Sequence, residues 1–210
     1  MQGAMMSRSD LYKITKFDPF ENQLCRQIRN ELSASLMDSI HRQDISILKA
    51  VAQRFSPDHV EPVLAQYIDN RITRYREVIA QIRPTTIPTH DTYAISLLLW
   101  DQELFFEVHE WIESKWLESR GAEKQLLQAL IRAAGVYVHL EAGNPKRAER
   151  MAIKALPPLI QHKSLVPGYF NVDRLIASLE PLNSVPPKLG SGSDLLGAKY
   201  PPWNNSGAQM

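Results

Sequence analysis

FFEVHEWIESKW, residues 105–116, decides the fold class, because its apolar residues recur at the spacing of an α-helix. A helix turns by about 100° per residue, which places His109 and Glu113 in the middle of the apolar face and Glu110 on its flank. Glu107 falls on the opposite side and is expected to be solvated. A carboxylate on an enclosed face needs a partner, so the stretch predicts a buried polar network or a metal or acid–base site.

Helical periodicity continues on both sides of this stretch. Residues 92–118 form one predicted helix, and the other predicted helices cover residues 20–40, 44–55, 62–82, 123–142, 145–156 and about 171–180. Gly143 suits the left-handed exit of one helix, and a Pro-Pro pair at 157–158 is expected to end the next. No segment has the pattern of a regular β-sheet. The sequence therefore predicts an all-α bundle of about six to seven helices with an extended C-terminal tail.

Proline and glycine divide the chain into three predicted parts. RPTTIPTH, residues 83–90, interrupts the helical pattern and marks the best internal boundary. Residues 1–92 are expected to be a helical extension packed on the bundle, and residues 93–180 the main helical domain. Residues 181–210 are rich in proline, glycine and serine and are expected to form the tail.

Composition limits the class of protein. The chain has 210 residues, 44% hydrophobic and 22% charged, with a formal net charge of +1. That balance is ordinary for a globular protein and gives no reason to expect nucleic acid as a partner. One cysteine, Cys25, suits a reducing compartment and is expected to be buried. Without a signal-like start or an apolar run of about 20 residues, we expect a cytoplasmic protein with no membrane partner.

The helix predicted over residues 123–142 supplies partners for the first stretch. If the short turn between the two helices makes them antiparallel, Glu113 comes level with Gln128, and His109 with Arg132. The polar candidates share a position on or beside these two apolar faces. The candidates for a buried network or a ligand site are His109, Glu110, Glu113, Trp116, Gln128, Arg132 and His139.

A metal site is the sharper alternative. His109, Glu113 and His139 would provide two histidines and a carboxylate, a donor set used by zinc and non-haem iron. The antiparallel register opposes it, because His139 then lies about 10 Å along the axis from His109. HEWIE also lacks the second histidine of the HExxH metalloprotease motif. The sequence favours no metal and assigns no catalytic residue.

The helix predicted over residues 145–156 carries four basic residues on one stripe, at spacings of three and four. They are Lys146, Arg147, Arg150 and Lys154. Such a stripe is typical of a solvated face. Weak binding to an anionic, phosphate-bearing partner is the alternative.

LLLWDQELFFEVHEWIESKW and LLQALIRAAGVYVHLEAGNPKRAERMAIKAL together resemble the domain of unknown function 309 family over about residues 97–160. The matching positions are Glu107, His109, Glu110, Glu113 and Trp116, then Leu127, Gln128, Leu130, Ile131, His139, Gly143 and Asn144. The chain departs from the family pattern at Ala129, Arg132 and Val138, in place of glycine, glutamine and tyrosine. The resemblance implies a compact helical bundle and no particular reaction.

The sequence thus favours a non-enzymatic structural or interaction module that could form a homo-oligomer, with no cofactor and an unidentified partner. The alternative is a metal-dependent hydrolase or related enzyme centred on His109, Glu110, Glu113 and His139.

Overall fold

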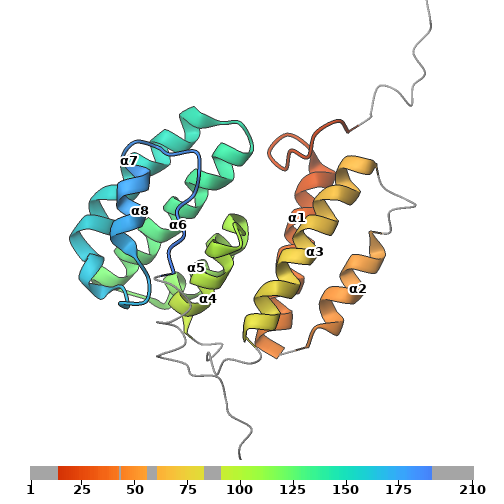
Figure 1. Ribbon diagram of the computed structural model, residues 1–210, viewed down its shortest axis with the longest axis horizontal. Coiled ribbons are helices and arrows are strands. Elements are labelled where there is room, and N and C mark those ends of the chain that lie inside the picture. Colours follow the sequence, from red (N-terminus) through yellow and green to blue (C-terminus); the bar gives the residue numbers. More distant parts are fainter. Residues whose placement is uncertain (1–13, 43, 56–60, 83–90, 191–210) are drawn as a thin grey trace, which may run out of the picture. The chain divides into compact units, whose positions relative to one another are not determined.

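The computed structural model describes residues 14–42, 44–55, 61–82 and 91–190, and these residues are predominantly helical (Figure 1). The helices are α1 (Gln23–Arg42), α2 (Ser46–Arg54), α3 (Pro62–Ile82), α4 (Thr92–Asp101), α5 (Phe105–Glu118), α6 (Gly121–Glu141), α7 (Pro145–His162), the 3-10 helix η3 (Lys163–Leu165) and α8 (Val172–Leu179). The described residues contain one isolated antiparallel bridge, between Phe170 and Gly190, and no strand. The all-α prediction is confirmed. No helix in the described ranges combines the length and apolarity needed to cross a membrane.

The chain divides into two compact units, residues 1–75 and 76–210, with the boundary inside α3. The predicted boundary at residues 83–90 lies outside the described residues. The packing of residues 1–92 on the bundle stays a prediction.

The first unit contains α1, α2 and the first part of α3. Four apolar residues that recur every four positions in α1 are buried, namely Ile28, Leu32, Leu36 and Ile40, whereas Leu24, one step earlier in the same row, is 40% exposed. Cys25, three positions before Ile28, is buried too, and its enclosure raises the pKa of the thiol. The periodicity of this segment therefore predicted its core face correctly from Ile28 onward and wrongly at Leu24.

After residue 90, the second unit has two helices where the sequence predicted one. Glu103 has a φ of 56°, and the N–H of Leu104 donates to the carbonyl of Leu99 at 3.0 Å. A residue in the left-handed region cannot continue a right-handed helix, so α4 ends at Asp101 and α5 starts in a new direction at Phe105. The prediction of an unbroken helix over residues 92–118 is wrong for this reason.

Aromatic packing links three helices of this unit. The rings of Trp100 and Phe105 lie 5.0 Å apart, and the Tyr137 ring from α6 lies 5.4 Å from Trp100. All three side chains are buried. The Tyr137 hydroxyl and the Ser178 hydroxyl are 3.0 Å apart, which joins α8 to the same centre.

α6 and α7 form an antiparallel hairpin (Figure 1). Gly143 has a φ of 77°, which confirms the predicted left-handed exit from α6. Asn144 occupies the position before α7, and Pro145 is its first residue. The tight turn fixes which residues of the two helices face one another.

α7 passes through Pro157 and Pro158 and ends at His162, so the predicted end at the Pro-Pro pair is wrong. Pro158 has no N–H to donate to the carbonyl of Lys154, four residues earlier. The guanidinium Nη1 of Arg132 donates to that carbonyl instead, at 3.2 Å. A side chain from α6 thus satisfies the group that the proline leaves open.

The start of the predicted tail lies against α4. The indole Nε1 of Trp100 donates to the Pro187 carbonyl at 2.8 Å, and the Asp101 carboxylate accepts from the N–H groups of Leu189 and Gly190 at 2.9 and 3.2 Å. Leu189 is fully buried. Residues 191–210 of the predicted tail lie outside the described residues.

Candidate functional site

The buried face of α5 differs from the predicted one. It consists of Phe105, Glu107, Val108, Trp111 and Ile112. Glu107, which was expected to be solvated, is completely enclosed.

The side chains expected to be enclosed are open to solvent to a large extent, with His109 at 32% and Glu113 at 45% exposure. The prediction that these two groups lie buried between helices is therefore wrong. Leu117, an apolar residue of the same helix, is 66% exposed. The true centre of the face is marked by Val108 and Trp111.

Three polar side chains on the outer face of α5 lie close together. His109 Nε2 is 3.9 Å from a Glu110 oxygen and 3.8 Å from a Glu113 oxygen. One potential ligand atom from each residue lies within 4.8 Å of the others. These three residues, all on one helix, could hold a divalent cation on an open surface. His139 does not belong to this group, so the two-histidine set of His109, Glu113 and His139 is not assembled.

Trp116 and Gln128, two other members of the predicted set, are half-buried. The Lys124 ammonium lies 4.6 Å from the centre of the Trp116 ring, a cation–π contact between α6 and α5. The Trp116 Nε1 is buried and has no hydrogen-bond partner within the described part of the chain.

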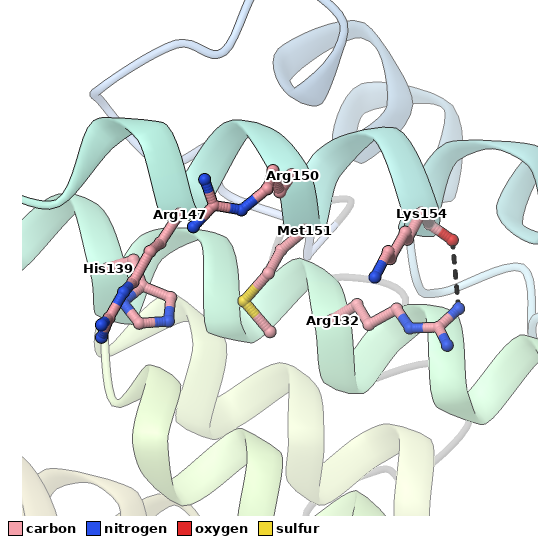
Figure 2. A pocket seen from close by; sticks show the side chains of 6 residues that line it. All are labelled: Arg132, His139, Arg147, Arg150, Met151 and Lys154. Atoms are coloured by element: carbon pink, nitrogen blue, oxygen red, sulfur yellow. Dashed lines mark hydrogen bonds between the residues drawn. The ribbon is translucent and has the colours of Figure 1, made fainter.

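Arg132 and His139, the remaining members, line a different site. They border a groove of about 300 Å³ between α6 and α7 (Figure 2). The groove also takes residues from the basic stripe of α7. Its lining is Arg132, His139, Arg147, Arg150, Met151 and Lys154. The lining thus combines four cations, an imidazole and a thioether, with no carboxylate among them.

The hairpin register explains why these side chains meet. Counting outward from the turn at Gly143 pairs Arg132 with Lys154, and His139 with Arg147. The Arg132–Lys154 pair is joined by the hydrogen bond to the Lys154 carbonyl. Figure 2 shows these pairs at opposite ends of the groove, with Met151 between them.

The middle of the groove depends on a glycine. A Cβ atom at position 135 would lie 2.5 Å from the Met151 Cε, which is closer than van der Waals contact permits. Gly135 therefore allows the Met151 side chain to lie close against α6.

Like charges inside the groove change the titration of its imidazole. Partial burial lowers the pKa of His139 below the ordinary value of 6.5, and the nearby Arg147 and Arg150 lower it further. His139 is therefore mainly neutral at pH 7. The contributions of Arg147 and Arg150 add to the effect of burial and indicate a positive potential at the imidazole.

The groove escaped the sequence prediction because its residues were assigned to two different sites. Arg132 and His139 were assigned to a network with α5, and the basic residues of α7 to a separate stripe. The missing step was to apply the register around Gly143 to α6 and α7, as had been done for the two preceding helices. Lys154 and Arg147 then fall opposite Arg132 and His139.

A comparison with protein families agrees with the resemblance seen in the sequence. Residues 95–151 match the model of the family described as "Domain of unknown function (DUF309)". This DUF309 segment covers most of α4, all of α5 and α6 and the first seven residues of α7, and it confirms the predicted resemblance. It contains His109, Glu110 and Glu113 and every residue of the groove lining except Lys154. No curated protein and no solved structure matches the chain.

Proposed function

We propose that the protein is a non-enzymatic interaction module that binds an anionic, phosphate-bearing ligand in the groove between α6 and α7. One observation carries the proposal: two helices bring Arg132, Arg147, Arg150 and Lys154 to one groove that no carboxylate lines. Like charges at close range raise the free energy of the unbound protein, and an anion would remove that repulsion.

A solvated face is the simpler interpretation of basic residues on α7, but it does not account for the contribution from α6. Arg132 is half-buried, and its guanidinium is held by the Lys154 carbonyl. Such an arginine keeps part of its planar donor set for a ligand and has little freedom left to lose. Arginine guanidinium groups bind phosphate oxygens through paired, charge-assisted hydrogen bonds, which supports a phosphate-bearing ligand.

Binding of inorganic tripolyphosphate, measured by isothermal titration calorimetry at constant ionic strength, tests the proposal. The wild-type protein should bind one equivalent, and Arg132→Gln/Arg147→Gln should weaken binding by at least about ten-fold, since each lost ionic hydrogen bond contributes about 1.5–3 kcal/mol. Lys146→Gln is the matched control, because Lys146 is an exposed cation of α7 outside the groove lining. It should change the affinity by less than about two-fold.

Two results would contradict the proposal. One is the absence of saturable binding by the folded wild-type protein. The other is an equal loss of affinity in Lys146→Gln and in the groove variant, which would show attraction to overall charge instead of a site.

A metal-dependent activity is the second candidate, supported by the proximity of His109, Glu110 and Glu113. Elemental analysis of the purified protein would support it by finding stoichiometric zinc, iron or manganese that is lost in His109→Ala. The groove proposal expects no such metal requirement for anion binding.

A further inference from the structure

The polar residues of the groove gather at two separate ends. Arg132 and Lys154 face each other at one end, and His139 and Arg147 at the other (Figure 2). Seven residues separate the two ends on each helix, which is about 10 Å along the axis. Because seven residues are close to two helical turns, both ends open on the same side of the hairpin.

The position of the Arg132 side chain at its end of the groove has a specific structural cause. Pro158 cannot donate to the Lys154 carbonyl, and Arg132 Nη1 occupies that acceptor at 3.2 Å. Pro158 is thus a positioning residue for Arg132. At the opposite end, both Arg147 and Arg150 influence His139 electrostatically.

Met151 is the one apolar side chain among the six that line the groove. The Met151 thioether lies over Gly135 between the two ends, and none of the six lining residues is aromatic. A continuous polyanion would place charge over the thioether, and a nucleic-acid base would find no ring to stack on. This arrangement suits a ligand whose central part is uncharged.

From these features, and resting on the proposed function, we infer that the ligand is a small organic compound with a phosphate group at each end, about 10 Å apart. One phosphate binds Arg132 and Lys154, and the other binds Arg147 with His139 beside it. The groove volume of about 300 Å³ is at the lower end of the range for small-molecule sites, which agrees with a compact ligand.

Three probes of matched chemistry test this inference: 1,6-hexanediol bisphosphate, hexyl phosphate and inorganic pyrophosphate. The first has two separated phosphates, the second has one, and the third has two adjacent phosphates. Calorimetric titration at constant ionic strength should show that the bisphosphate binds at least about ten-fold more tightly than either of the others, because linked groups bind the second end intramolecularly.

Variants at each end separate the two contacts. Arg132→Gln and Arg147→Gln should each reduce the affinity for the bisphosphate by about ten-fold, to nearly that of hexyl phosphate. Each should change the affinity for hexyl phosphate by no more than about two-fold, since the other end still binds one phosphate. Lys146→Gln is the control for charge alone, and thermal unfolding establishes that all variants are folded.

The outcomes distinguish this inference from the proposed function. If pyrophosphate or hexyl phosphate binds as tightly as the bisphosphate, the two-ended ligand is wrong and the anion groove stands. If none of the probes nor tripolyphosphate binds, both are wrong. Tight binding of a single-stranded oligonucleotide or of anionic lipid vesicles, with weak binding of the bisphosphate, would also overturn the two-ended ligand.

Discussion

The outer face of α5 and the groove between α6 and α7 both contain polar side chains, but α5 combines an imidazole with carboxylates, whereas the groove combines an imidazole with cations. On α5, His109 lies within 4 Å of the carboxylates of Glu110 and Glu113, so a protonated imidazole would be neutralised by its own helix. In the groove, His139 shares its surroundings with Arg147 and Arg150, so protonation adds to an existing positive charge. The imidazole of the first region thus lies beside carboxylates, whereas none of the residues that line the second region carries one.

This difference shows that a polar cluster indicates a binding site more strongly when its charges are unbalanced. Partly exposed ion pairs within one helix contribute little free energy and are common. Uncompensated cations contributed by two helices raise the free energy of the fold, and a bound anion would lower it.

The largest expected effect concerns the side of α5 that faces the core. Glu107→Ala should lower the free energy of unfolding by about 1–3 kcal/mol, because it removes an enclosed carboxylate and its polar contacts. Urea unfolding would measure the change. Glu113→Ala, on the outer face of the same helix, is the matched control and should stay within about 0.5 kcal/mol of wild type. Equal losses in both variants would show that the two faces of α5 are not distinct.

The next effect separates stability from binding at one end of the groove. Pro158→Ala should stabilise the protein by about 1 kcal/mol, since alanine restores a main-chain donor inside α7. It should also weaken bisphosphate binding by about three-fold, because the restored N–H competes with Arg132 for the Lys154 carbonyl. Pro157→Ala is the control and should stabilise α7 without weakening binding. An unchanged affinity of Pro158→Ala for the bisphosphate would show that Pro158 does not position Arg132.

A smaller effect should appear in the titration of His139, whose surroundings include Arg132, Arg147, Arg150 and Lys154. Its pKa in the folded protein is below the ordinary value of 6.5. The unfolded chain therefore takes up a proton more readily, and stability should fall as the pH drops below about 6.5.

Proton NMR of the imidazole, with and without tripolyphosphate, would measure this pKa. The bound anion should raise it, and Arg147→Gln should raise it in the free protein, because both reduce the positive potential. His139→Gln should abolish its share of the acid-dependent loss of stability. A pKa that does not respond to the anion would place the ligand away from this end.

The smallest effect is expected on the outer face of α5. His109→Ala should change the free energy of unfolding by less than about 0.5 kcal/mol, since His109 and its neighbours are partly exposed. Anion binding should be unaffected. Loss of a stoichiometric metal in this variant would instead make the face a second binding site.

The sequence predicted the helical class and, apart from Leu24, the core face of α1, because the spacing of apolar residues is a local property. It placed the core face of α5 wrongly, because counting apolar residues cannot tell that Leu117 is exposed and Glu107 enclosed. The break at Glu103 depends on a left-handed backbone conformation at a residue type that seldom adopts one.

The basic residues of the groove were visible in the sequence as a regular stripe on α7. The partners on α6 required the register set by Gly143, which was itself predicted correctly. The residues near Pro158 do not reveal that α7 continues past it. The Lys154 carbonyl, which Pro158 leaves without a main-chain donor, accepts a hydrogen bond from Arg132, 22 positions away. Such long-range compensation is invisible to any rule that reads neighbouring residues.

The contacts of α4 with residues 187–190 have a consequence for synthesis of the chain. Trp100 and Asp101 bind main-chain groups that lie 87–89 positions later in the sequence. A nascent polypeptide therefore cannot complete this core until Leu189 has left the ribosome, although all of the DUF309 segment emerges earlier. The last step of folding should thus come after translation of the DUF309 segment. Until Leu189 has emerged, the apolar surface that it covers stays accessible to chaperones.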